Sequence, residues 1–153
     1  SFGSMPRIQY GLGLNLTYKK LDFGVFFNGS AQRKIMINNA MTEFGERNNN
    51  VMQWIADDHW SIDNPNPDAA FPRLGLSNTD IKNNKEASSH WLRNGNFIRF
   101  KTLEVGYSFP HCRVYFSGDN LAVWSPFKLW DPELSWNAYP LQRTFNFGVQ
   151  LNF

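Results

Sequence analysis

Strict alternation of apolar and polar residues marks three stretches of the chain and predicts three β-strands. Between 144 and 153 every odd position is Phe, Val or Leu, and every even position is polar or glycine. The same two-residue repeat covers 7–18 without a fault and continues after two residues over 21–33, where Phe26 falls among the inward positions. Two alternating runs separated only by Lys19 and Lys20 are typical of a β-hairpin.

Two more strands follow from weaker alternation at 96–109 and 112–123, and the last strand extends over about 142–153. Each run is longer than the ~5–6 residues usual in soluble proteins and reaches the ~9–11 residues that cross a bilayer when tilted. The connections are alternately short and long, at 19–20, 34–95, 110–111 and 124–141.

Outer-membrane barrels have short turns on the periplasmic side and long loops outside the cell. We therefore predict an all-β fold of five antiparallel transmembrane strands, with extracellular loops at 34–95 and 124–141 and a periplasmic C-terminus. Two alternatives stay open. A soluble, carbohydrate-binding β-sandwich would cover the apolar faces with a second sheet, and a passive porin would have the same strands without a plug.

Composition agrees with a strand-built membrane protein. The 153 residues contain no apolar run of about 18, which excludes a transmembrane helix. Aromatic residues make up 16% of the chain, as expected where aromatic girdles lie at both bilayer interfaces. The net charge of +2, with scattered Lys and Arg, gives no support for nucleic-acid binding. The single cysteine, Cys112, excludes an internal disulfide.

Several segments together resemble one family, the SusC/RagA-type TonB-linked outer-membrane transporters of Bacteroidetes. The matching segments are MPRIQYGLGLNLTYKKLDFGVFFNGS (5–30), NPNPDAAFPRL (64–74), WLRNGNFIRFKTLEVGYSFP (91–110), RVYFSGDNL (113–121), WDPE (130–133) and YPLQRTFNFGVQLNF (139–153). Their order and spacing are similar to the C-terminal end of the family. We therefore expect the chain to be a C-terminal piece that lacks the plug domain.

The resemblance implies the last five strands of a 22-stranded barrel. It implies active import of a large nutrient, an oligosaccharide or an oligopeptide, driven by the TonB–ExbB–ExbD complex. The implied partners are the rest of the barrel and its plug, a SusD-like surface lipoprotein, the barrel-assembly machinery, outer-membrane lipid, and a second transporter–lipoprotein pair in a dimer. It implies neither a cofactor nor an enzymatic activity.

Two groups of residues are candidate sites. Four aromatic residues of the second long connection are candidates for contact with substrate or with the lipoprotein lid, because aromatic side chains supply much of the contact energy at such surfaces: Trp124, Trp130, Trp136 and Tyr139. Packing within the loop is the competing explanation. The apolar positions of the last strand are a candidate signal for barrel assembly: Phe145, Phe147, Val149, Leu151 and Phe153.

Other polar residues are better explained by structure than by chemistry. Asp131 and Glu133 flank Pro132 and are predicted to be turn and cap groups. Inward-facing polar residues are predicted to solvate the barrel wall: Asn15, Asp22, Asn28 and Glu104. The Asn- and Asp-rich part of 34–95 has no EF-hand spacing, and turn chemistry explains it better than Ca²⁺ binding. His59, His90 and His111 lack zinc spacing.

The long connection at 34–95 contains one predicted helix. Asn50 followed by Gln53 has the form of a capping box, and the residues after it could form a short helix to about His59. The prolines at 65, 67 and 72 then favour extended chain.

Overall fold

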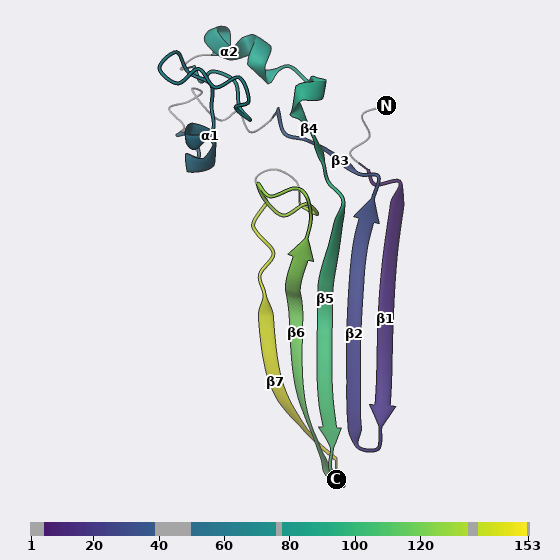
Figure 1. Ribbon diagram of the computed structural model, residues 1–153. Helices are drawn as coiled ribbons and strands as arrows, with labels where there is room; N and C mark the ends of the chain where they lie inside the picture. The colour runs from purple at the N-terminus through teal and green to yellow at the C-terminus, as the bar shows by residue number, and fades with distance from the viewer. Residues whose placement is uncertain (1–4, 39–49, 76–77, 135–137, 153) are drawn as a thin grey trace. The chain divides into compact units, whose positions relative to one another are not determined.

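The computed structural model describes residues 5–38, 50–75, 78–134 and 138–152 (Figure 1). The chain divides into two compact units. We call the first, Ser1–Ile35 with Asn94–Phe153, the sheet unit, and the second, Met36–Arg93, the insert unit.

Five long strands form one antiparallel sheet in the sheet unit. They are β1 (Ile8–Tyr18), β2 (Leu21–Ala31), β5 (Phe97–Ser108), β6 (Cys112–Trp124) and β7 (Thr144–Leu151). Their order across the sheet is β1-β2-β5-β6-β7, so each strand pairs with the next long strand along the chain. Every boundary lies within two residues of the range that alternation predicts. The fold is thus mostly antiparallel β-structure with few helices.

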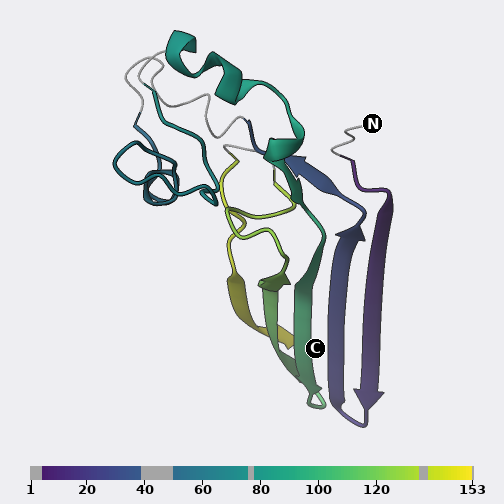
Figure 2. The same ribbon diagram turned by 45° about the horizontal axis from the view of Figure 1, so that its top comes forward.

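The connections differ at the two ends of the sheet. The turn between β1 and β2 has two residues, and Lys19 takes a left-handed φ of 56°. The turn between β5 and β6 is closed by a hydrogen bond from the Phe109 amide to the Cys112 carbonyl. Both short turns lie at the same end of the strands, and the long connections leave from the other end (Figure 1). The view of Figure 2 shows the same arrangement foreshortened.

Two irregularities in strand pairing keep the apolar side chains on one face of the sheet. Strict alternation through these points would move them to the opposite face. Between β2 and β5 the pairing passes from Phe26–Thr102 to Phe27–Phe100, which leaves Lys101 as an extra residue. Between β5 and β6 the register shifts again, close to Asn120, whose φ is 54°. Beyond a bulge of this kind, the odd and even positions of the bulged strand exchange faces of the sheet. Alternation alone does not predict either shift.

As a result, one face of the sheet is apolar throughout. We call it the apolar face; its large side chains are Ile8, Tyr10, Leu12, Leu14, Leu16, Tyr18, Leu21, Phe23, Val25, Phe27, Ile98, Phe100, Leu103, Val105, Tyr107, Val114, Phe116, Trp124, Phe145, Phe147, Val149 and Leu151. Leu12 is 68% exposed and Phe147 is 73% exposed. Within the described residues, no second sheet covers these side chains.

We call the opposite face the polar face. It carries Gln9, Gly11, Gly13, Asn15, Thr17, Asp22, Gly24, Phe26, Asn28, Ser30, Phe97, Arg99, Thr102, Glu104, Gly106, Arg113, Tyr115, Ser117, Asp119, Thr144, Asn146, Gly148 and Gln150. The predicted polar positions Asn15, Asp22, Asn28 and Glu104 all lie here.

The insert unit has a buried core of its own. Phe71 lies between Trp54, at 5.4 Å between ring centroids, and Trp91, at 6.2 Å. Ile55 and Ile81 are also buried. The short elements around them are α1 (Gln53–Asp57), α2 (Asn78–Lys85) and η2 (Ser89–Trp91). The region predicted as a loop at 34–95 therefore holds a small packed unit.

Backbone and side-chain hydrogen bonds join distant parts of the insert unit. The Trp91 indole donates to the Asn84 carbonyl at 3.0 Å, and the Asn84 amide donates to the Arg73 carbonyl at 3.0 Å. β3 (Lys34–Met36) and β4 (Leu92–Asn94) pair where the chain passes between the units.

The predicted capping box is wrong in detail. The helix α1 begins at Gln53, and its N-cap is Met52, which makes no side-chain capping bond. Gln53 instead donates from Nε2 to Asp57 Oδ1 at 2.7 Å, one helical turn along. Among the described residues, no helix is long and apolar enough to cross a membrane.

Candidate functional site

The polar face carries an ion cluster near the short turns. Arg113 of β6 extends across Gly106 of β5 and donates through Nε to Asp22 Oδ1 of β2 at 3.2 Å. Its Nη2 donates to Glu104 Oε1 at 2.6 Å and to the second oxygen of Asp22. A Cβ on Gly106 would lie 2.5 Å from both Arg113 Nη2 and Asp22 Oδ2, so the cluster requires glycine there. The cluster joins three strands on one face.

A second ion cluster lies toward the long connections and is far more buried. Arg99 of β5 is only 3% exposed. Its Nη2 donates to both Asp131 oxygens, at 2.6 and 2.7 Å, and its Nε donates to Glu133 Oε2 at 3.0 Å. Asp131 Oδ1 also accepts the Glu133 amide at 2.9 Å. Asp131 is thus a turn group, as predicted, and both carboxylates also neutralise a buried arginine, which the sequence analysis did not foresee.

The residues around these carboxylates fold onto the ends of the strands; we call residues 125–134 the Trp130 segment. Phe127 is buried against Trp130, with ring centroids 4.7 Å apart and an interplanar angle of 89°. Ser125 Oγ donates to the Asn96 carbonyl at 2.7 Å, and Arg33 Nη1 donates to the Pro132 carbonyl. The segment is therefore held by hydrogen bonds, an ion cluster and an aromatic contact at once.

An exposed phenylalanine lies on the polar face. Phe26 of β2 is 40% exposed, and its ring lies over two glycines of β1. A Cβ on Gly11 would lie 3.2 Å from the ring, and one on Gly13 would lie 3.5 Å from it. The missing side chains leave room for one edge of the ring beside the strand, and the rest of the side chain stays partly exposed.

The four aromatic residues named as candidate contacts occupy different settings. Trp124 ends β6, is exposed, and lies on the apolar face opposite Ile98. Trp130 packs against Phe127 within the Trp130 segment, which is the competing explanation given above. Tyr139 is exposed, and its hydroxyl accepts a hydrogen bond from Gln142 Nε2 at 2.9 Å. Trp136 lies outside the described residues. Their contact with substrate or lid stays a prediction.

The apolar positions of β7 lie together on the apolar face: Phe145, Phe147, Val149 and Leu151. Phe145 stacks on Phe116 of β6, with ring centroids 6.0 Å apart. Phe153 lies outside the described residues. This arrangement fits a terminal assembly signal, and that role stays a prediction.

Sequence comparison finds related TonB-dependent receptors. No protein-family model matches the chain. Two receptors of Formosa agariphila, TonB-dependent receptor P26 and TonB-dependent receptor P3, are 28% and 26% identical to it over 97% of its length. That length corresponds to 17% and 16% of the two relatives, so the chain spans about a sixth of each.

Solved structures give the same result. The RagAB peptide importer in its open-open state matches 98% of the chain, with 27% identity and a TM-score of 0.69. In its closed-closed state it matches the same share, with 26% identity and a TM-score of 0.72. The chain covers 17% and 18% of these two structures. These similarities confirm the resemblance to SusC/RagA-type TonB-dependent transporters that the sequence motifs indicate.

Proposed function

We propose that the chain forms part of the barrel wall of a TonB-dependent outer-membrane transporter that imports a large nutrient. One observation carries this proposal: the five-stranded sheet exposes an unbroken apolar face. An exposed apolar patch of that extent in a water-soluble protein would cause aggregation unless a partner covered it. In a barrel wall, lipid covers the apolar face and the lumen solvates the polar face.

The strand dimensions fit this role. A strand of 11 residues, as in β1 and β2, is about 36 Å long at ~3.3 Å per residue. Tilted by ~45°, it spans about 26 Å, close to the ~25 Å apolar band of outer-membrane barrels. Both bulges preserve the apolar face, as a wall in contact with lipid requires.

The asymmetric connections support an orientation for the strands in the membrane. The end with short turns is periplasmic, so the C-terminus lies in the periplasm, and the insert unit and the Trp130 segment belong to extracellular connections. β1 and β7 form the edges of the sheet. Because open edges promote aggregation, each edge pairs with another strand, and the resemblance implies a closed barrel of 22 strands around a plug.

The mechanism and partners follow from the family resemblance. TonB–ExbB–ExbD supplies energy to the plug, a SusD-like lipoprotein closes the outer mouth, and the barrel-assembly machinery inserts the strands. Two transporter–lipoprotein pairs form a dimer. The imported molecule is an oligosaccharide or an oligopeptide. This stretch of the barrel contributes wall, extracellular structure and binding surface rather than catalysis.

Membrane fractionation and uptake together test the proposal. The full-length protein should remain in the outer-membrane fraction after alkaline carbonate washing and require detergent for extraction. Nutrient uptake by cells that depend on it should stop when TonB is deleted. Recovery in the soluble fraction would favour the sandwich, and uptake that persists without TonB would favour a passive porin.

A further inference from the structure

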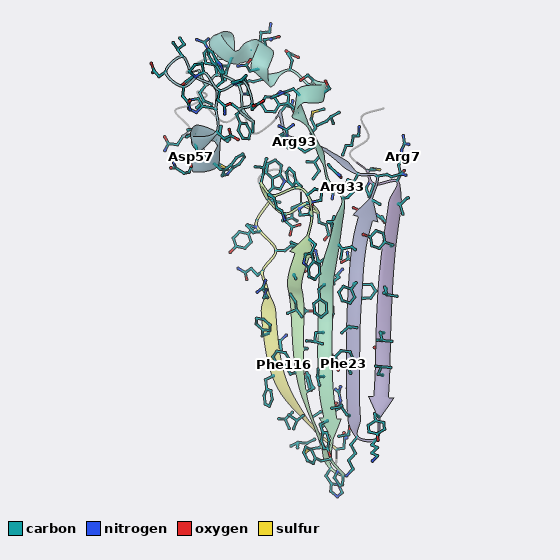
Figure 3. The ribbon with its side chains drawn as sticks, viewed as in Figure 1. Arg7, Phe23, Arg33, Asp57, Arg93 and Phe116 are labelled. Atoms are coloured by element: carbon teal, nitrogen blue, oxygen red, sulfur yellow. The ribbon has the colours of Figure 1, made fainter. Side chains whose placement is uncertain are left out.

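A hollow of about 580 Å³ opens on the polar face, beside the Trp130 segment. This size falls within the ~300–1,000 Å³ typical of small-molecule sites. Its lining comes entirely from the sheet unit and includes Gln9, Phe26, Asn28, Ser30, Arg33 and Glu133. Figure 3 labels Arg33, which follows the end of β2.

Three polar atoms in the lining are buried without a hydrogen-bond partner among the described residues: Asn28 Oδ1, Ser30 Oγ and Arg33 Nε. Ser30 is only 3% exposed. An unpaired buried donor or acceptor destabilises a fold, so most such groups in native proteins have partners. Three of them in the lining of one hollow indicate that a ligand completes their hydrogen bonds.

The three atoms differ in whether they donate or accept hydrogen bonds, and this limits the chemical classes of ligand that fit the hollow. Asn28 Oδ1 accepts, Arg33 Nε donates, and the Ser30 hydroxyl does both. Two arginines, Arg33 and Arg99, and two carboxylates, Asp131 and Glu133, lie in or beside the lining, so their formal charges cancel. A set with both donors and acceptors and no net charge suits a neutral ligand rich in hydroxyl groups, because each hydroxyl can also donate and accept.

The Phe26 ring adds an apolar surface to this polar set. It borders the hollow and is 40% exposed, and one edge of the ring lies beside Gly11 and Gly13. The face of an aromatic ring carries partial negative charge and attracts weakly positive C–H groups. A pyranose ring has such C–H groups on its flat side and hydroxyls on its rim, so it fits both features together.

We propose that this hollow is a binding subsite for one neutral sugar unit of an oligosaccharide, stacked on Phe26 and hydrogen-bonded by Asn28, Ser30 and Arg33. The inference rests on the proposed function, because only in a barrel wall does the polar face line a transport path. A peptide fits the polar atoms but has no regular C–H face for the Phe26 ring.

The test uses the full-length transporter, purified in detergent and immobilised. One sample is incubated with a fluorescently labelled pool of neutral oligosaccharides from hydrolysed polysaccharides, and a second with a labelled tryptic peptide pool. After washing, retained label is measured. We expect the wild type to retain sugars and not peptides. Retention of peptides alone, or of neither pool, would overturn the proposal.

Three variants locate the binding in the hollow. Phe26→Leu keeps apolar bulk but removes the flat ring, so sugar retention should fall about tenfold or more, by analogy with ring-stacking losses, while Phe26→Tyr should retain sugar. Ser30→Ala removes an unpaired hydroxyl. It should therefore leave the melting temperature unchanged or raised while weakening sugar binding several-fold.

Ser117→Ala is the matched control, because Ser117 lies on the same polar face but outside the hollow. It should not change sugar retention. If Phe26→Leu and Ser30→Ala bind like wild type, sugars bind elsewhere and the subsite does not exist. TonB-dependent uptake that persists in that case would leave the proposed function standing, so the two failures are distinguishable.

Discussion

The two units of this chain bury their apolar side chains in opposite ways. In the insert unit, Trp91 is 2% exposed and packs, with Phe71, into a core. In the sheet unit, Leu12 and Phe147 point away from the protein, and the groups that are most buried include the charged Arg99. The insert unit has the organisation of a protein folded for water. The sheet unit exposes its apolar side, which is stable only where hydrocarbon or another apolar surface covers it.

The largest expected effect tests the core of the insert unit. Trp91→Ala should destabilise that unit by about 3–5 kcal/mol, the usual cost of truncating a buried tryptophan. Since the indole also donates to the Asn84 carbonyl, the variant leaves that acceptor unpaired. Hydrogen exchange of the full-length protein should accelerate across Met36–Arg93, while β1 and β2 keep their protection. Equal acceleration in both units would contradict the division between them.

A charged residue on the apolar face tests whether lipid covers that face of the sheet unit. Leu12→Arg places a guanidinium in the middle of β1 and should reduce barrel stability by about 2–4 kcal/mol at the bilayer midplane. Refolding into phospholipid vesicles, followed by gel mobility without boiling, measures the loss. Asn15→Arg is the matched control, because it lies on the polar face of the same strand and should cost much less. Equal losses would mean that lipid does not cover one face alone.

The sequence predicts the strands of the sheet unit well, because the pattern that identifies each strand lies within that strand's own residues. A two-residue repeat identifies a strand and its faces at once, as in β1 and β7. The bulges at Lys101 and Asn120 escape prediction because each depends on the register of a neighbouring strand. The insert unit escapes because its core joins residues far apart in sequence, such as Phe71 and Trp91.

The side-chain contacts of the polar face also cannot be predicted from the local sequence alone. The position of Asp22 is predictable from alternation, but its pairing with Arg113, 91 residues away, depends on strand order. The contact of Arg99 with Asp131 depends on the path of the Trp130 segment. One signal for the Phe26 surface was present: an inward aromatic residue opposite glycines of β1.

A smaller effect is expected at the Trp130 segment. Arg99→Ala removes hydrogen bonds to two carboxylates and leaves Asp131 largely buried, which should cost about 1.5–3 kcal/mol. Hydrogen exchange should accelerate in residues 125–134 while the insert unit stays protected. Arg113→Ala breaks a partly exposed cluster and should have a smaller effect, because water can replace its contacts. A larger loss in Arg113→Ala would show that burial does not decide the strength of these clusters.

The smallest expected effect provides the sharpest comparison. Ile62 in the insert unit is 77% exposed, slightly more than Leu12 in the sheet unit. If both side chains faced water, an arginine at either position would change stability by less than about 0.5 kcal/mol. We expect Ile62→Arg to be neutral in thermal melting while Leu12→Arg is costly, because only Leu12 contacts lipid. Neutrality at both positions would place the apolar face in water and remove the basis for the barrel. A large loss at Ile62 would show that exposure alone does not identify the water-facing unit.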